Sequence, residues 1–207
     1  MIRRPVSLGA TAFLLLLAGC STTPSGNDSS GATTPSMPDP TAAEQVKAEP
    51  LTPERLQTLW WSWASSAEPS PVDDTDGQLC GDSQPFGVWL VASTKTGTAD
   101  RRCQVPSTLP IAGPAVSTVT PDAAACAKFL ADAKGEALVD NQPQQLEKID
   151  PMKIQYDTDK GQKEGYGCGL WVRINPLPPG EHTLTLRGNT GAQATEAHYD
   201  LTVVKLP

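Results

Sequence analysis

The sequence predicts a mainly β domain, an antiparallel β-sandwich or jelly-roll with two added helices, which follows a signal peptide and a disordered linker. Three observations support this class. Apolar and polar residues alternate with the period of a β-strand in several segments of the second half of the chain. Helical spacing of apolar residues occurs in only two segments. Turn-rich loops separate these segments, which favours antiparallel strands over a parallel α/β sheet.

The first twenty residues have the layout of an export signal. Arg3 and Arg4 precede an apolar run of about a dozen residues, and small residues follow it. The run is too short to be a good membrane span, which needs about 20 apolar residues. Its ending, Leu17-Ala18-Gly19-Cys20, resembles the bacterial lipobox. This resemblance implies that residues 1–19 are removed and that Cys20 carries the lipid. The alternative is an ordinary secreted protein with a chance cysteine.

Residues 20–50 are expected to form a lipid-anchored flexible linker. Small, polar and proline residues dominate this segment, so it cannot bury enough apolar surface to offset its ordering entropy. Its Ser and Thr residues are alternatively sites for O-linked sugar. Without Arg3 and Arg4, the chain has 14 basic and 23 acidic residues, a net charge of −9. This charge disfavours nucleic acid and gives no electrostatic help at an anionic membrane, so the lipid must be the anchor. We therefore expect a lipid-anchored protein on the extracytoplasmic side of the cell membrane.

Residues 51–207 remain for one β-rich globular domain, and its first element is a helix. Thr52 is the expected N-cap, Pro53 the first helical residue, and an apolar stripe begins at Leu56. Trp61 lies off this stripe, so it is either half-buried under a loop or exposed to a ligand. A second helix is expected over residues 120–134, with Thr120 as its cap. Its apolar stripe is Cys126, Phe129, Leu130 and Ala133.

Four segments have the pattern of strands. Residues 86–92 form an unbroken apolar run, which predicts a strand that is buried on both faces. Residues 170–175, 182–187 and 199–203 alternate between apolar and polar positions. Trp171 falls on the face opposite Leu170 and Val172. With Trp61 it is therefore a candidate for an exposed aromatic surface.

Four cysteines remain after Cys20 is assigned to the lipid: Cys80, Cys103, Cys126 and Cys168. An even number in an exported chain indicates disulfides, for which three connectivities exist. We favour Cys80 with Cys103 and Cys126 with Cys168, because each pair closes a loop of moderate length. The spacings contain no close cysteine pair of the kind that zinc sites use, so no metal and no cofactor are expected.

Five segments occur in an order that resembles a group of exported bacterial proteins of unknown function. They are residues 60–64, 76–80, 88–92, 102–106 and 175–183, and the last contains the specific turn Pro178-Pro179-Gly180-Glu181-His182. The resemblance implies a secreted β-rich fold and a Cys80–Cys103 disulfide. It implies no activity. The chain departs from the pattern at Cys168, where an aspartate is usual.

The sequence contains few candidates for chemistry. Asp73, Asp74 and Asp76 surround Gly77, but an EF-hand would need ligands where Val72 and Ser83 stand, so a turn is the preferred interpretation. His182, beside Glu181, is the strongest candidate for a general base or a ligand contact. A structural histidine that is hydrogen-bonded to the preceding turn is the favoured alternative, because no nucleophile motif accompanies it.

Three functions remain open. The first is a non-catalytic, lipid-anchored module that binds an envelope protein or glycan through its loops or through Trp61 and Trp171. The second is a hydrolase or lyase that acts on envelope polymers with Asp73, Asp74, Asp76 or Glu181, and it requires two carboxylates facing each other across a cleft. The third is a solute-binding lipoprotein, which is disfavoured because one domain lacks the two lobes that close around a solute.

Overall fold

The computed structural model describes residues 50–191 and 193–205, so the predicted signal peptide (1–19) and nearly all of the predicted linker (20–50) lie outside the described residues. The described part is mainly β with two helices, which confirms the predicted fold class. Its elements are α1 (Pro53–Ala64), β1 (Trp89–Leu90), β2 (Gly97–Pro106), β3 (Ile111–Thr120), α2 (Ala123–Asp132), β4 (Lys134–Val139), β5 (Gln142–Pro143), β6 (Leu146–Tyr156), β7 (Lys163–Ile174), β8 (Gly180–Asn189) and β9 (Ala194–Val204).

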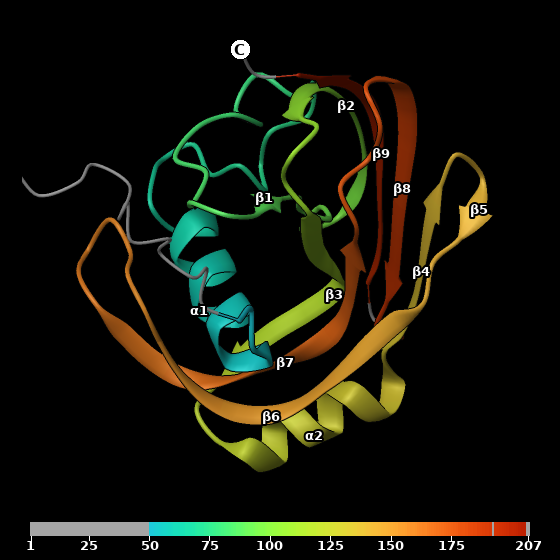
Figure 1. Ribbon diagram of the computed structural model, residues 1–207. Coiled ribbons are helices and arrows are strands. Elements are labelled where there is room, and N and C mark those ends of the chain that lie inside the picture. The colour runs from blue at the N-terminus through green and yellow to red at the C-terminus, as the bar shows by residue number, and fades with distance from the viewer. Residues whose placement is uncertain (1–49, 192, 206–207) are drawn as a thin grey trace, which may run out of the picture. The chain divides into compact units, whose positions relative to one another are not determined.

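The strands form two mixed sheets (Figure 1). A four-stranded sheet has the order β1-β3-β7-β6, and a five-stranded sheet has the order β2-β9-β8-β4-β5. Most neighbouring strands are antiparallel, as expected, but β1 runs parallel to β3 and β2 runs parallel to β9. The second parallel pair arises because β9 turns back along β8 and then takes the place between β8 and β2.

Two apolar clusters cover the two faces of the four-stranded sheet. Val172 and Ile174 of β7 pack against the five-stranded sheet, while Trp171 packs on the opposite face with residues of α1. Trp171 is 0% exposed, so the prediction that it belongs to an exposed aromatic surface is wrong. Apolar and polar residues do alternate along β7. Because both faces of this strand are covered, neither face has to be polar.

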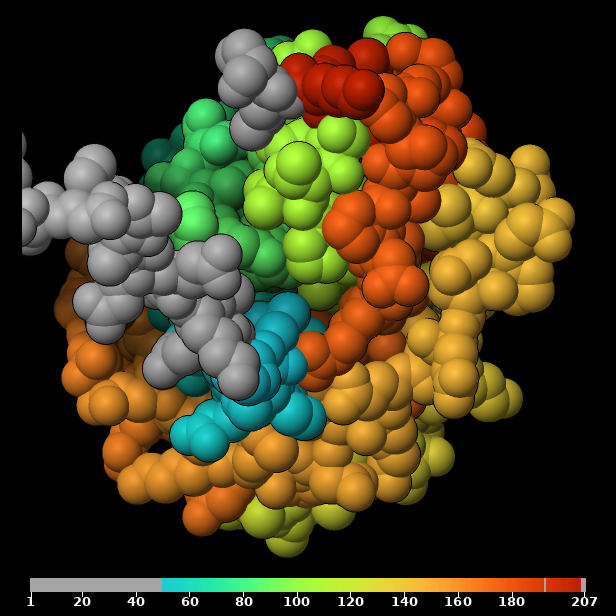
Figure 2. Space-filling view, in the orientation of Figure 1, coloured from blue at the N-terminus to red at the C-terminus, as the bar shows by residue number. Residues whose placement is uncertain are grey.

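Helix α1 begins as the sequence predicts. The Thr52 side chain accepts a hydrogen bond from the Arg55 amide, and Pro53 is the first helical residue. Leu56, Trp60 and Trp63 of its apolar stripe are buried. The helix lies on the inner side of the curved β6–β7 pair (Figure 1), and its outer side (cyan) remains at the surface next to β6 (Figure 2).

The second helix is shorter than expected. Thr120 is still the last residue of β3, and the cap is Asp122, whose carboxylate accepts a hydrogen bond from the Ala125 amide. Cys126 is the buried residue of α2 and is bonded to Cys168 of β7. The other disulfide joins Cys80 to Cys103, so both pairs are those favoured from the sequence. Because almost no loop separates β3 from α2, the pattern at Thr120 fitted the cap of a helix as well as the end of a strand.

The predicted strand over residues 86–92 is also shorter. Residues 88–92 are buried, but only Trp89 and Leu90 pair with β3. Phe86 is 95% exposed and precedes Gly87, which has a φ of +87°. This turn ends the extended segment on its N-terminal side. The sequence did not single out β2, β3, β4, β5 or β6.

The segment between α1 and β1 is held by a buried guanidinium group. Arg101 of β2 is 2% exposed and donates hydrogen bonds to the main-chain oxygens of Val72, Asp74 and Ala92. It also donates to the Tyr199 hydroxyl, which itself donates to the Ala92 oxygen. Burial of Tyr199 raises the pKa of its phenol above the ordinary value. Arg101 therefore connects the irregular segment to β2 and to β9.

The substitution Arg101→Met should lower the free energy of unfolding by about 3 kcal/mol or more, because the main-chain oxygens of Val72 and Asp74 lose their donor and that of Ala92 keeps only the Tyr199 hydroxyl. Denaturant unfolding followed by circular dichroism measures the difference. The matched control is Arg102→Met, because the side chain of Arg102 is 88% exposed, and it should change the value by less than about 0.5 kcal/mol. Equal losses in the two variants would contradict the structural role of Arg101.

Candidate functional site

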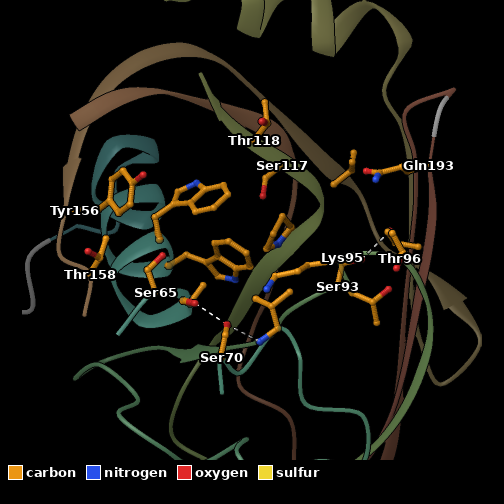
Figure 3. A pocket seen from close by; sticks show the side chains of 18 of the residues that line it. Ser65, Ser70, Ser93, Lys95, Thr96, Ser117, Thr118, Tyr156, Thr158 and Gln193 are labelled. Atoms are coloured by element: carbon orange, nitrogen blue, oxygen red, sulfur yellow. Dashed lines mark hydrogen bonds between the residues drawn. The ribbon is translucent and has the colours of Figure 1, made fainter. Parts of the chain in front are cut away.

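A cleft opens where β1 ends. Strand β1 pairs only with Ile111 and Ala112, whereas β3 continues to Thr120 and has no described strand on that side. The space beside the open edge of β3 is a cleft of about 670 Å³, bounded by α1, the turn between β6 and β7, residues 93–96, and the turn between β8 and β9. We call it the β3 cleft (Figure 3). Its volume lies within the range of about 300–1,000 Å³ that is usual for small-molecule sites.

One wall of the β3 cleft is aromatic. Trp60 and Trp61 of α1 and Tyr156 of β6 line it. Trp60 is buried and donates its indole N–H to the Val91 oxygen at 2.8 Å. Trp61 is half-buried, and its ring centroid lies 6.1 Å from that of Tyr156. The indole N–H of Trp61 is enclosed and has no hydrogen-bond partner among the described residues. Trp61 and Tyr156 thus form a paired aromatic surface that is partly accessible from the cleft.

Two hydrogen bonds attach the end of α1, the helix that carries Trp60 and Trp61, to the turn that follows β6. The Asp157 amide donates to the Ser62 hydroxyl, and the Asp159 amide donates to the Ser65 main-chain oxygen at the C-terminal end of α1. These bonds attach the β6–β7 turn to the helix. Tyr156 is therefore placed beside Trp61 by contacts between residues about 95 positions apart in the sequence.

The rest of the lining is rich in hydroxyl groups. Eleven of its 25 residues are Ser, Thr or Tyr. Some of these groups are used internally: the Ser70 hydroxyl donates to the Ala64 oxygen, and the Ser93 hydroxyl donates to the Thr195 hydroxyl. The hydroxyls of Ser117 and Thr118 make no hydrogen bond to the described residues, and both residues are half-buried. Figure 3 shows Ser117 across the cleft from Tyr156, whereas the neighbouring Thr118 points to the other face of β3, as its pairing with Cys168 requires.

The charges of the β3 cleft are few and mixed in sign. The lining contains Lys95, Lys163, Glu68 and Asp159. The Lys95 ammonium group lies 2.7 Å from a carboxylate oxygen of Asp73, which is outside the lining, so part of its charge is already neutralised. The cleft therefore has no concentration of either sign that would select a highly charged ligand.

His182 lies elsewhere, at the start of β8. Its Nδ1 is 2.7 Å from a carboxylate oxygen of Asp140, and its Nε2 is 3.0 Å from the Pro178 oxygen. The Asp140 carboxylate also accepts a hydrogen bond from the Thr183 amide. This arrangement is the structural histidine that the sequence favoured, bonded to the preceding proline turn. Both ring nitrogens face acceptors, which suits the protonated imidazolium.

The hydrogen bond that the His182 ring donates to the Asp140 carboxylate raises the pKa of His182 above its ordinary value, and the same bond lowers the pKa of Asp140. The pair therefore stabilises the fold most between the ordinary pKa of an aspartate and that of a histidine. Its contribution is lost as the pH rises through the folded-state pKa of His182, and also as the pH falls through that of Asp140.

Asp140→Asn should bring the pKa of His182 down toward about 6.5, the ordinary value for histidine. Asparagine tolerates the positive φ of this position, 49°, so the turn should persist. A proton NMR titration of the His182 ring measures the shift. The control is Asp150→Asn on β6, which should leave the titration unchanged. An unaltered His182 titration in the Asp140 variant would show that the carboxylate does not hold the proton.

The acidic residues of the hydrolase hypothesis do not line the β3 cleft. The Asp74 carboxylate accepts hydrogen bonds from the amides of Asp76, Gly77 and Leu79, so this segment forms a turn. Glu181 accepts a hydrogen bond from the Thr202 hydroxyl at the surface of the five-stranded sheet. The pKa of Asp76 is lowered by its hydrogen bond from Gln78, which is the opposite of what a general acid requires.

The remaining site residues that the sequence suggested lie in three different places. Trp61 lines the cleft, Trp171 is buried beneath α1, and Cys20 lies outside the described residues. The sequence did not identify Tyr156, Ser117 or Thr118, which also line the cleft. Among residues 50–191 and 193–205, no three His, Cys, Asp or Glu side chains are placed to hold a metal.

Comparison with protein-family models finds no family that matches this chain, and comparison with curated proteins finds no relative. In the part of the chain that the structure describes, neither helix has the length and hydrophobicity needed to cross a membrane.

Proposed function

We propose that this protein is a lipid-anchored, non-catalytic binding module at the extracytoplasmic side of the cell envelope, with the β3 cleft as its ligand site. The observation that supports binding is the combination of a partly accessible aromatic pair with unused hydroxyl groups in one cleft. Such a lining provides apolar contact area and orienting hydrogen bonds, which are the usual parts of a small-ligand site.

The hydrolase or lyase hypothesis is less well supported. That chemistry requires two carboxylates facing each other across a cleft, one of them with a raised pKa. The two carboxylates that line the β3 cleft are Glu68 and Asp159, and Asp159 lies 4.0 Å from the Lys160 ammonium group. The four acidic residues considered from the sequence lie outside the lining. Binding without bond cleavage is therefore the better account of this cleft.

A solute-binding protein could use the same cleft, but it would also need two lobes that close around the solute. The described residues form two sheets joined by one apolar core. A packed interface of this kind does not open like a hinge. We therefore favour recognition of a ligand that enters from outside over enclosure of a free solute.

Lipid anchoring rests on the lipobox at Leu17-Ala18-Gly19-Cys20. The chain expressed with its signal in bacteria should take up labelled palmitate and sediment with membranes. Cys20→Ser should abolish both, because the thiol is the attachment point, and two or three acyl chains are needed for stable attachment. Ser21→Ala is the control, because it keeps the cysteine and should behave as the parent chain. Labelling that survives in the Cys20 variant would contradict the anchor.

Binding at the β3 cleft is tested by an NMR screen of the processed full chain in detergent against a library of small polar and aromatic fragments. Chemical-shift changes should gather at Trp61, Ser117 and Thr118 rather than around His182. Tyr156→Ala should weaken the fragments that bind there about tenfold, through the loss of aromatic contact. The control is Tyr166→Ala on β7, which lies outside the lining. Shift changes scattered over the surface, or none at all, would overturn the binding site.

A further inference from the structure

We infer that the ligand of the β3 cleft is a neutral oligosaccharide, a segment of a glycan chain. This inference rests on the binding function proposed above and names the ligand class. Three features of the cleft support it: the aromatic pair, the unused hydroxyl groups opposite, and the unpaired main-chain edge of β3 that forms the floor.

The aromatic pair fits the apolar face of a sugar ring. Trp61 and Tyr156 are half-buried, so each presents part of a ring to the cleft. Their planes are tilted by 49° with centroids 6.1 Å apart, which leaves a surface bent along its middle. A pyranose ring has C–H groups on its faces and hydroxyls on its rim, so it can pack a face against an aromatic ring while its rim stays polar. Two neighbouring sugar units can contact the two rings.

The opposite wall fits the polar rim. Hydroxyl groups donate and accept hydrogen bonds, as sugar hydroxyls do, so a wall of hydroxyls can match a sugar in either direction. The Ser117 hydroxyl makes no hydrogen bond to the described residues, which leaves it available on the face of β3 that Trp171 and α1 share. The amide side chain of Gln193 also lines the cleft and offers a donor and an acceptor together.

The floor adds main-chain groups. The Ala112 oxygen accepts from the Val91 amide, so Ala112 directs its main-chain groups toward β1. The β3–β7 register shifts by one residue between Pro114 and Val116, and Ser117 then pairs with Gly169. Counting alternate residues along β7 places the N–H and C=O of Ser117 on the open side. These groups have no strand to bond and can bond a ligand instead.

The charges favour a neutral ligand over an anionic one. Lys163 makes no ion pair with the described residues, but Glu68 and Asp159 share the lining with it, and Lys95 is paired with Asp73. An anionic sugar polymer would gain little attraction from this balance. The open edge could also pair with an extended peptide, but such pairing draws on main-chain bonds and does not use the hydroxyl wall.

The test is a titration of the processed full chain in detergent with maltotetraose, cellotetraose and chitotetraose, followed by NMR. A tetragalacturonate and the peptide Thr-Val-Thr-Val-Thr are titrated in parallel. At least one neutral oligosaccharide should shift the Trp61 indole and the Ser117 amide resonances in a saturable manner. Trp61→Ala should weaken that binding about tenfold. Ser117→Ala should weaken it about threefold to tenfold.

Thr202→Ala is the matched control, because Thr202 is exposed on β9 outside the lining, and it should leave the affinity unchanged. If Trp61→Ala proves unfolded by circular dichroism, Ser117→Ala and Tyr156→Ala decide the question. Binding of only the tetragalacturonate or only the peptide at the cleft would overturn the oligosaccharide and leave the binding module intact. If neither these probes nor the fragment library shifts the cleft resonances, both proposals fail.

Discussion

The buried hydrogen bonds of Arg101 are the constraint on which the arrangement of the domain depends. One guanidinium group satisfies main-chain oxygens of the segment between α1 and β1, and the same group meets the Tyr199 hydroxyl on the last strand. The segment has little regular structure, so its polar groups need partners from elsewhere. Arg101 thus sets where the segment runs and, through Ala92, where β1 ends.

The early end of β1 is what creates the β3 cleft. If β1 continued along β3, the edge at Ser117 would be paired and the space beside α1 would be filled by its side chains. Instead, the chain leaves β3 at Ala92 and turns away through residues 93–96. The helix and the β6–β7 turn then close the other side, joined by the hydrogen bond from Asp157 to Ser62. The site is therefore a consequence of how two elements are positioned, while His182 lies elsewhere and is occupied by structural hydrogen bonds.

Local signals in the sequence predict the local structure well, and they fail where distant segments decide. Thr52 and Pro53 specify the start of α1 because capping depends on the next few residues alone. The alternation in β7, β8 and β9 survives because one face of each must be apolar. Trp171 was misplaced because alternation does not reveal that α1 covers the second face. Tyr156 and Ser117 were not recognised as site residues because their proximity to the cleft depends on the ends of β1 and β6, which no short pattern encodes.

The position of β9 between β2 and β8 in the five-stranded sheet has a consequence for the timing of folding. Strand β2 has β9 as its described neighbour, and Arg101 finds its phenol partner only when Tyr199 has arrived. Before the eleven residues of β9 have been synthesised, β2 lacks the neighbouring strand with which it forms its hydrogen bonds. The Arg101 guanidinium group then also lacks one of its acceptors. Contacts between such distant segments form slowly. The five-stranded sheet should therefore be completed only after β9 has been synthesised, so the domain cannot reach its folded state before synthesis is nearly finished.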